Sequence, residues 1–402
     1  MQVESINLLQ REVRTMRNIY FDNAATTKVL PEIAGEMSRI MVEEYGNPSS
    51  IYGLGQQAAG IVAAARENVA ALINARPEEI YFTSGGSEGD TMLIMGAAHK
   101  LASRGRHIIT TAVEHHAVLH TCAQLEKEGF EVTYLPVDSY GRVSAEQVKN
   151  ALRSDTILVS VMYANNEIGT IMPIREIGAV CRGHKVLFHT DAVQAVGHIP
   201  VDVQADNIDL LTLTGHKFHG PKGCGAVYIR KGLKVSQLIF GGGQEKGLRP
   251  GTENTAGIAG LGMAAGHAAA HMAENGRRMA ALRDKIIKGV TERIPEVILN
   301  GDPVNRLPNN VNFSIKYIEG ESLLLLLNHA GIAASSGSAC TSGSLDPSHV
   351  LLAIGLPHEI AHGSLRLTLS EFSTEEEADY LLEQLPPIVE RLRMMSPLYN
   401  RN

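Results

Sequence analysis

The segment Thr214-Gly215-His216-Lys217-Phe218-His219-Gly220 decides the fold of this chain. It ends the apolar run Ile208 to Thr214, which predicts a buried strand followed by a polar, glycine-flanked turn. Partial desolvation and a neighbouring imidazole lower the pKa of an amine at the rim of a sheet. Lys217 is therefore a candidate for Schiff-base formation, although a solvated loop lysine is the more common explanation for so short a motif.

Short β-branched runs alternate with longer helical patterns between residues 80 and 230. Such alternation predicts an α/β fold with a mostly parallel sheet, whose strands are joined by crossover helices. The seven predicted strands are Ile80 to Thr83, His107 to Thr111, Glu131 to Leu135, Ile157 to Met162, Val186 to Thr190, Leu210 to Thr214 and Ala226 to Arg230. Ligands collect at the carboxyl ends of parallel strands, so we expect the chemistry in the loops that follow them.

The pattern changes at a long predicted helix, Gly257 to Met279. Shorter elements follow, predicted as a strand at Asn310 to Ile315, a helix at Leu323 to Leu327, a strand at Ser364 to Leu369 and a terminal helix from Thr374. We therefore predict two domains. The large domain covers residues 19–262, and a smaller α+β domain combines residues 263–402 with the N-terminal extension 1–18.

Composition places the chain among ordinary globular proteins. Its 402 residues are 44% hydrophobic and 20% charged, enough to bury two cores. The net charge of −7 comes from interspersed acids and bases, which argues against nucleic acid or a membrane as a partner. Met1 to Asn18 carries several charges and has no apolar signal core, so we expect a cytoplasmic protein.

The four cysteines differ in their surroundings. They form no CxxC pair and show no metal-ligand spacing, so we expect neither disulfides nor a metal site. Cys122, Cys181 and Cys224 are predicted to act as small buried hydrophobes. Cys340 lies in the small-residue run Ala334 to Ser344, which has little to pack and predicts a mobile loop that could carry a thiol between sites.

Four loops at predicted strand ends carry complementary polar groups. Ser84-Gly85-Gly86-Ser87-Glu88-Gly89-Asp90 is a glycine-rich turn into a helix, whose free amides would hold a phosphate. Asp191-Ala192-Val193-Gln194 places an acid where it needs a cation such as a protonated ring nitrogen. Glu114-His115-His116 offers imidazoles for stacking or proton transfer, and Tyr163-Ala164-Asn165-Asn166-Glu167 follows another strand. Singly each is more often structural, but together with Lys217 they specify pyridoxal 5′-phosphate.

With these motifs the chain resembles the cysteine desulfurases of the NifS/IscS-like group, within the class-V aminotransferases. The resemblance runs from about Tyr20 to the end of the chain and implies the fold-type-I architecture of pyridoxal-phosphate transferases. Its markers are Tyr20-Phe21-Asp22-Asn23-Ala24-Ala25-Thr26-Thr27, Gly46-Asn47-Pro48-Ser49-Ser50, Tyr163-Ala164-Asn165-Asn166-Glu167-Ile168-Gly169, His189-Thr190-Asp191-Ala192-Val193-Gln194, Gly215-His216-Lys217 and Ser335-Ser336-Gly337-Ser338-Ala339-Cys340.

The resemblance implies a role for each residue of a pyridoxal 5′-phosphate site. Lys217 would bind the cofactor as a Schiff base, Asp191 would pair with its ring nitrogen, and Gln194 would donate to its ring hydroxyl. His115 would stack on the ring and transfer protons, and Asn166 would orient cofactor and substrate. The residues implied to hold the phosphate are Gly86, Ser87, Thr214, His216 and, reaching over from a partner subunit, Thr252. The shared phosphate site implies a homodimer.

The resemblance also implies the reaction. L-cysteine would be converted to L-alanine while its sulfur moves to Cys340 as a persulfide, with Lys217, His115 and Cys340 as the catalytic residues. Arg366 matches the arginine that binds the substrate carboxylate, a role suited to the guanidinium fork. The persulfide would serve an acceptor such as a scaffold for iron–sulfur cluster assembly or a tRNA-thiolation enzyme.

A few positions depart from the common pattern, and alternatives stay open. Ser87 and Thr91 replace a usual threonine and a frequent asparagine, while Ser370-Glu371 replaces a frequent Gly-Arg and puts partner-surface chemistry in doubt. A selenocysteine lyase would share the pocket but need no persulfide loop of this kind. Gly85-Gly86-Ser87-Glu88-Gly89 also fits the GxSxG pattern of serine hydrolases, with Ser87 as nucleophile, but a hydrolase leaves the Gly-His-Lys motif unexplained.

Overall fold

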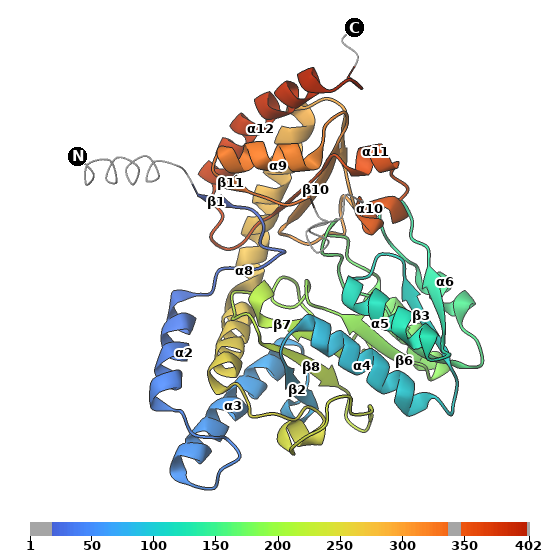
Figure 1. Cartoon of the computed structure of the whole chain (residues 1–402), viewed down its shortest axis with the longest axis vertical. Coiled ribbons are helices and arrows are strands. Elements are labelled where there is room, and N and C mark those ends of the chain that lie inside the picture. The colour runs from blue at the N-terminus through green and yellow to red at the C-terminus, as the bar shows by residue number, and fades with distance from the viewer. Residues whose placement is uncertain (1–17, 337–346, 400–402) are drawn as a thin grey trace.

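The computed structural model describes residues 18–336 and 347–399, which form a larger and a smaller packed unit (Figure 1). The larger unit contains a seven-stranded sheet in the order β2-β8-β7-β6-β5-β3-β4. Its strands are β2 (Ile80–Thr83), β3 (His107–Thr111), β4 (Glu131–Leu135), β5 (Thr156–Ser160), β6 (Leu187–Asp191), β7 (Leu210–Thr214) and β8 (Gly225–Ile229). Neighbours are parallel except at β8, which is antiparallel to β2 and β7. The predicted α/β fold with its mostly parallel seven-stranded sheet is confirmed.

Alternate side chains of the central strands enter two hydrophobic cores, one on each face of the sheet. Ile108 and Leu158 belong to the core beneath α4 and α5, whereas Ile109 and Val159 belong to the core beneath α3, α6 and α7. Because both faces are covered, β3, β5 and β7 are buried at every residue. The helices are α2 (Pro31–Glu43), α3 (Gly53–Leu72), α4 (Gly86–Leu101), α5 (His116–Lys127), α6 (Ala145–Ala151) and α7 (Ile174–His184).

The smaller unit has its own sheet and its own core. The antiparallel order is β12-β10-β9, and a separate pair, β1 with β11, runs parallel. Its core gathers Val311 and Phe313 of β10 with Leu323 of α9 and Leu381 of α12. The elements are β1 (Ile19–Tyr20), β9 (Val297–Leu299), β10 (Asn310–Ile315), α9 (Gly320–His329), β11 (Ile332–Ala333), α10 (His349–Ala353), α11 (His358–Ala361), β12 (Ser364–Thr368) and α12 (Glu375–Met395).

One helix, α8 (Thr255–Arg293), runs through both units (Figure 1). Up to Ala268 its buried apolar residues pack in the larger core, and from Met279 onward they pack in the smaller one. The predicted division after residue 262 therefore falls inside a continuous helix, and the predicted helix end at Met279 is wrong because apolar spacing continues through Ile286 and Val290. No helix of the described ranges is long and apolar enough to cross a membrane.

Candidate active site

The predicted lysine lies where the sheet meets the N-terminal segment. Lys217 ends a 3₁₀ turn, η2 (Gly215–Lys217), directly after β7. Its Nζ donates to the carbonyl oxygens of Ala24 at 2.6 Å and Ala25 at 2.8 Å. Gln194 Nε2 donates to the same Ala24 oxygen at 3.0 Å. Two residues predicted from separate loops therefore meet around one peptide group.

Asp191 ends β6 at the same edge of the sheet and is 6% exposed. Its Oδ1 accepts from the Val193 amide at 2.9 Å. Burial raises the pKa of Asp191 to about 6, while the Val193 hydrogen bond and the Lys217 charge oppose the rise. A buried carboxylate under such a desolvation penalty would be stabilised by a cationic ring nitrogen, so Asp191 fits the expected cofactor.

A second carboxyl group lies behind Asp191. Asp90, on α4, is 1% exposed, and burial followed by the charge of Asp191 raises the pKa of Asp90 well above its usual range. Two neighbouring buried carboxyls do not both ionise readily, so Asp90 holds the proton and Asp191 the negative charge. Asp90 was not predicted as a site residue, although an acid on the apolar side of a helical pattern is a signal in the sequence.

The glycine-rich turn before α4 forms a cradle beside these residues. A Cβ on Gly86 would lie 3.0 Å from Val193 Cγ2, and one on Gly85 would lie 3.8 Å from Thr214 Oγ1. The first amides of α4 have no acceptor within the helix, because the i−4 carbonyls lie before it. Ser87 is exposed on this first turn. Free amides, a hydroxyl and little side-chain bulk fit a phosphate group.

Thr214 and His216 border the same cradle. Thr214 Oγ1 donates to the Cys224 carbonyl at 3.1 Å, so this hydroxyl would have to rotate to donate to a phosphate. His216 Nδ1 lies 3.2 Å from Thr26 Oγ1. Burial, followed by the charge of Lys217, lowers the pKa of His216 to about 4, so the ring is a neutral hydrogen-bonding group at neutral pH.

His115 caps the N-terminus of α5. Its Nδ1 accepts from the Ala117 amide at 3.1 Å, which leaves the proton of the neutral ring on Nε2. Burial lowers the pKa of His115 to about 4, and the charge of Lys217 contributes next. A neutral ring whose ionisation responds to Lys217 is suited to stack beside a cofactor and to exchange a proton at Nε2.

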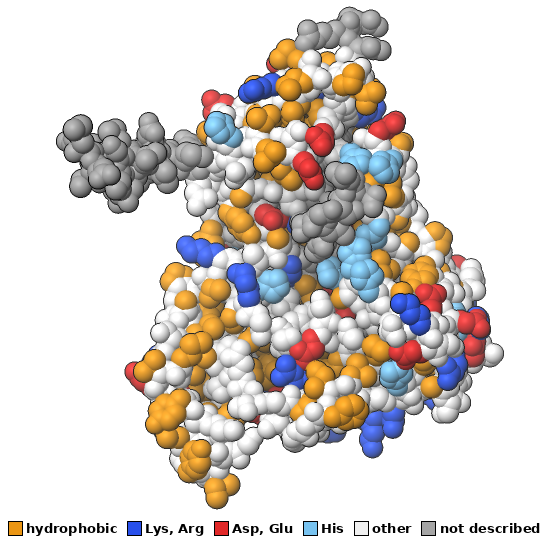
Figure 2. All heavy atoms as spheres, viewed as in Figure 1, with side chains coloured by type: hydrophobic (Ala, Val, Ile, Leu, Met, Phe, Trp, Pro, Cys, Tyr) orange, Lys and Arg blue, Asp and Glu red, His pale blue; other side chains and the backbone are white. Residues whose placement is uncertain are grey.

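More imidazoles gather on this face of the molecule, between the two units (Figure 2). The ring centroid of His116 lies 5.0 Å from that of His120 and 4.8 Å from that of His349. His349 belongs to α10 of the smaller unit, and its Nε2 lies 3.0 Å from the Glu114 carbonyl oxygen. The start of α5 is therefore held against the smaller unit beside His115. No group that could hold a metal ion is found among the described residues.

Arg366 reaches the site from β12 of the smaller unit. Its side chain is 3% exposed, with Nη2 donating to Asp22 Oδ1 at 2.9 Å and Nη1 donating to the Asn166 carbonyl at 3.1 Å. Its Nε is buried without a hydrogen-bond partner among the described residues. An unsatisfied buried guanidinium donor is costly, and a substrate carboxylate would satisfy it. Asp22 was quoted as a sequence marker, but only the structure gives it this contact.

Two predicted site residues do not join this group. Thr252 is exposed in the segment before α8. Cys340 lies outside the described residues, as does the extension up to Arg17. Ser335 begins the segment that leads to Cys340 and pairs with Arg366, through an Arg366 amide to Ser335 carbonyl bond of 2.6 Å and the reverse bond of 3.2 Å.

In the described residues, Ser87 has no neighbouring base of the kind that the serine-hydrolase alternative requires. A serine nucleophile requires an imidazole or similar base within hydrogen-bond distance. In the described part of the chain, no histidine hydrogen-bonds to Ser87, and the neighbouring Glu88 pairs with Arg249 at 2.8 Å. The GxSxG match is therefore explained by the glycine cradle.

Comparisons with known proteins identify the family of this chain. The family model described as aminotransferase class-V matches residues 19–381. The chain is 57% identical over 380 residues to the cysteine desulfurase IscS of Methanosarcina thermophila, covering 94% of each chain. It is also similar to the solved structure of a NifS-like protein, with a TM-score of 0.88 and 40% identity over 93% of this chain and 100% of that one. The structure titled "SspA in complex with cysteine" has a TM-score of 0.79 and 37% identity, over 89% of this chain and 100% of that one.

Proposed function

Since this chain belongs to the class-V aminotransferase family, and a relative 57% identical over nearly its whole length is a cysteine desulfurase, we infer that it is a cysteine desulfurase that depends on pyridoxal 5′-phosphate. The observation that carries this inference is the meeting of Lys217, Gln194 and Asp191 beside the glycine cradle. When bound, the cofactor supplies an electron sink for the substrate α-carbon.

Each residue of the site has a distinct role in the proposed reaction. Lys217 Nζ would hold the cofactor, and the amine of Lys217 would accept the proton that leaves the substrate Cα. Asp191 would pair with the ring nitrogen through its negative charge, which it can keep because the neighbouring Asp90 holds a proton. His115 would exchange a proton through Nε2. Arg366 binds the substrate carboxylate through its unsatisfied Nε edge.

Cys340 accepts the sulfur in this proposal. Its thiolate forms an S–S bond with the substrate sulfur while the Cβ–S bond breaks, and Cβ gains a proton, so L-cysteine and one thiol give L-alanine and one persulfide. Chain length supports this role. Cys340 lies five residues beyond Ser335, and an extended chain of that length reaches up to about 17 Å from the Arg366 pairing.

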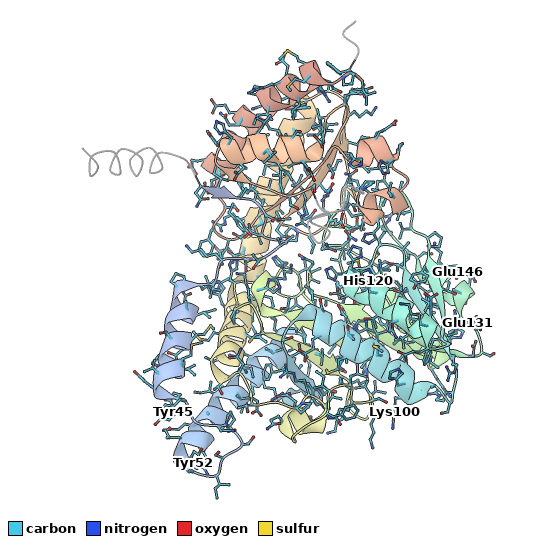
Figure 3. All side chains as sticks on the ribbon, viewed as in Figure 1. Tyr45, Tyr52, Lys100, His120, Glu131 and Glu146 are labelled. Atoms are coloured by element: carbon cyan, nitrogen blue, oxygen red, sulfur yellow. The ribbon has the colours of Figure 1, made fainter. Side chains whose placement is uncertain are left out.

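We propose that Thr252 completes the phosphate site of a partner subunit, which makes the protein a homodimer. Thr252 is exposed, and the loop that carries it packs with Pro250 against Gly241, next to Phe240, which is 82% exposed. More apolar side chains project from the end of α2 and the start of α3, including Tyr45 and Tyr52 (Figure 3). Exposed apolar surface of this kind favours burial against a second chain.

Subunit mixing tests the shared site. Lys217→Ala and Thr252→Ala chains should each be impaired alone, whereas a mixed dimer contains one intact site made from Lys217 of one chain and Thr252 of the other. Random mixing should restore about a quarter of wild-type turnover. If Thr252 serves only its own subunit, mixing restores nothing, and light scattering would show whether the chains still pair.

We propose an acceptor protein for the persulfide, such as a scaffold for iron–sulfur cluster assembly or a tRNA-thiolation enzyme. The location of Cys340 in a segment of small residues supports delivery of the persulfide sulfur, because a thiol fixed in the site could not also meet a partner.

A cytoplasmic location is supported by Cys122, Cys181 and Cys224, which are buried as free thiols, as is usual in a reducing compartment.

Anaerobic incubation with L-cysteine tests the activity. Wild-type protein should release L-alanine and gain the mass of one sulfur atom on the peptide that contains Cys340. Borohydride treatment of the resting protein should attach the cofactor to the peptide that contains Lys217. Alanine release without sulfur on Cys340 would indicate a lyase that expels sulfur directly, and no cofactor on Lys217 would overturn the assignment.

A further inference from the structure

Glu371 is a partly buried acid between the two units, and the proposed reaction gives it no role. It follows β12 in the turn Ser370–Ser373, and its side chain is 13% exposed. Both carboxylate oxygens face His267 Nε2, at 2.9 and 3.1 Å, and Oε2 also accepts from Asn275 Nδ2 at 2.6 Å. His267 and Asn275 lie on α8, where that helix passes from the larger core to the smaller one.

The same carboxylate faces the turn that carries Lys217. Glu371 Oε1 lies 3.9 Å from the Nε2 of His219, two residues beyond Lys217. His219 is itself fixed, because its amide donates to Thr27 Oγ1 at 2.7 Å and its Nδ1 lies 2.8 Å from the Lys28 carbonyl oxygen. The ring of Phe372, the residue after Glu371, meets the His219 ring edge-on at 5.3 Å.

The strand before Glu371 carries Arg366, the arginine that is proposed to bind the substrate. Arg366 lies on β12, and Glu371 follows that strand in the turn that leads to α12. A rigid strand transmits the placement of its end to the side chains along it. Glu371 therefore joins the strand that carries Arg366, the helix that crosses both units and the turn that carries Lys217.

The surroundings keep Glu371 ionised. Burial works to raise its pKa, but the hydrogen bond from His267 and the charge of His219 outweigh burial, so the pKa of Glu371 is lowered. A small cavity of about 20 Å³ lies beside it among His198, His219 and Asn275, with room for one water molecule. A partly buried carboxylate with several donors forms directional hydrogen bonds, which suits it to fix the geometry between packed elements.

We propose that Glu371 is a positioning residue, which sets the distance between Arg366 and Lys217 by linking β12 to His267, Asn275 and His219. The proposal rests on the proposed function, in which Arg366 binds the substrate carboxylate and Lys217 holds the cofactor. Arg366 touches the substrate away from the bonds that change. Loosening its strand therefore weakens binding of the ground state and transition state alike, which raises KM more than it lowers kcat.

Steady-state kinetics of the cofactor-loaded protein test whether KM rises more than kcat falls. Glu371→Ala should raise KM for L-cysteine about tenfold and change kcat by less than about threefold. Glu371→Gln keeps part of the hydrogen bonding and should lie between Glu371→Ala and wild type. The matched control is Glu390→Gln, an exposed acid on α12, which should leave both constants unchanged. His267→Ala combined with Glu371→Ala should raise KM no further than Glu371→Ala alone, because both changes break one connection.

Amide hydrogen exchange without substrate provides a readout that is independent of turnover. Glu371→Gln should speed exchange in residues 364–373 and 215–220, and leave β3 at the wild-type rate. Wild-type KM in Glu371→Ala would overturn the proposal, as would wild-type exchange in Glu371→Gln or a fall in kcat with KM unchanged in Glu371→Ala. Wild-type protein that releases no L-alanine would overturn the proposed function instead, while the exchange measurement would still decide whether Glu371 links these segments.

Discussion

Arg366 donates from Nη2 to Asp22 Oδ1 at 2.9 Å, joining residues 344 positions apart in the chain. The bond ties β12 of the smaller unit to the N-terminal segment that also supplies the carbonyl acceptors of Lys217. Asp22 occupies only one edge of the guanidinium, and Nε remains without a partner in the described residues. With Nη2 on Asp22 and Nη1 on the Asn166 carbonyl, the guanidinium is held in one orientation and keeps its Nε donor for a substrate carboxylate.

Replacing Arg366 with lysine should weaken substrate binding and leave the cofactor in place. An ammonium cannot present two parallel donors, so we expect KM for L-cysteine to rise about a hundredfold. Cofactor attached to Lys217, measured by borohydride reduction and mass spectrometry, should match wild type. An unchanged KM would contradict the role given to Arg366.

Replacement by asparagine should reduce turnover at Asp191, which is ionised, but not at the neighbouring Asp90, which is protonated. Asp191→Asn removes the proposed partner of the ring nitrogen, and loss of a buried charge pair is expected to reduce turnover about a hundredfold or more. Asp90→Asn resembles the protonated acid already present, so its turnover should stay near wild type. The comparison uses L-alanine release and retention of cofactor during dialysis. Equal losses in both variants would mean that the proton is not held by Asp90.

Glu114 should make the protein less stable as pH rises. Burial raises its pKa from 4.5 to about 8, opposed by hydrogen bonds from the Met162 amide and the Thr111 hydroxyl. Between these values the folded protein keeps a proton that the unfolded chain releases, so the free energy of unfolding falls with increasing pH and levels off above about 8.

Glu114→Gln removes this titration. The fall in the free energy of unfolding with pH should therefore be smaller by about 1.4 kcal/mol per pH unit between pH 4.5 and about 8. Urea unfolding of both proteins at several pH values checks the difference, since contributions from all other groups are shared. Parallel curves for wild type and Glu114→Gln would show that Glu114 does not retain the proton.

Of the four cysteines, only Cys340 should take part in sulfur transfer, and the other three should contribute to stability. Cys340→Ala should keep cofactor on Lys217 but lose persulfide and L-alanine. Cys122, Cys181 and Cys224 are buried, and burial raises the pKa of each thiol to about 11 or 12, so none is a ready nucleophile. Changing any of them to serine should lower stability, measured by thermal unfolding, and leave sulfur transfer intact. Wild-type sulfur release by Cys340→Ala would contradict the persulfide mechanism.

Much of the large sheet was predictable because its signals are local. Runs such as His107 to Thr111 and Leu210 to Thr214 match the observed β3 and β7, since a strand covered on both faces requires consecutive apolar or β-branched residues. The ends of β5, β6 and β8 differ by one or two residues, because the last residues of a strand depend on their neighbours in the sheet. The long α8 was predicted too short for a similar reason, as its second half is stabilised by packing in the smaller core.

The sequence by itself determined which chemical groups stand at the ends of the strands, because a strand that ends at Thr214 must deliver Lys217 to the rim of the sheet. It could not determine which distant groups face each other there. The shared Ala24 carbonyl, the Asp22 contact of Arg366 and the position of Glu371 between α8 and the Lys217 turn were decided by tertiary structure alone. Each joins segments from opposite parts of the chain, and such contacts depend on how the two cores pack rather than on any local pattern.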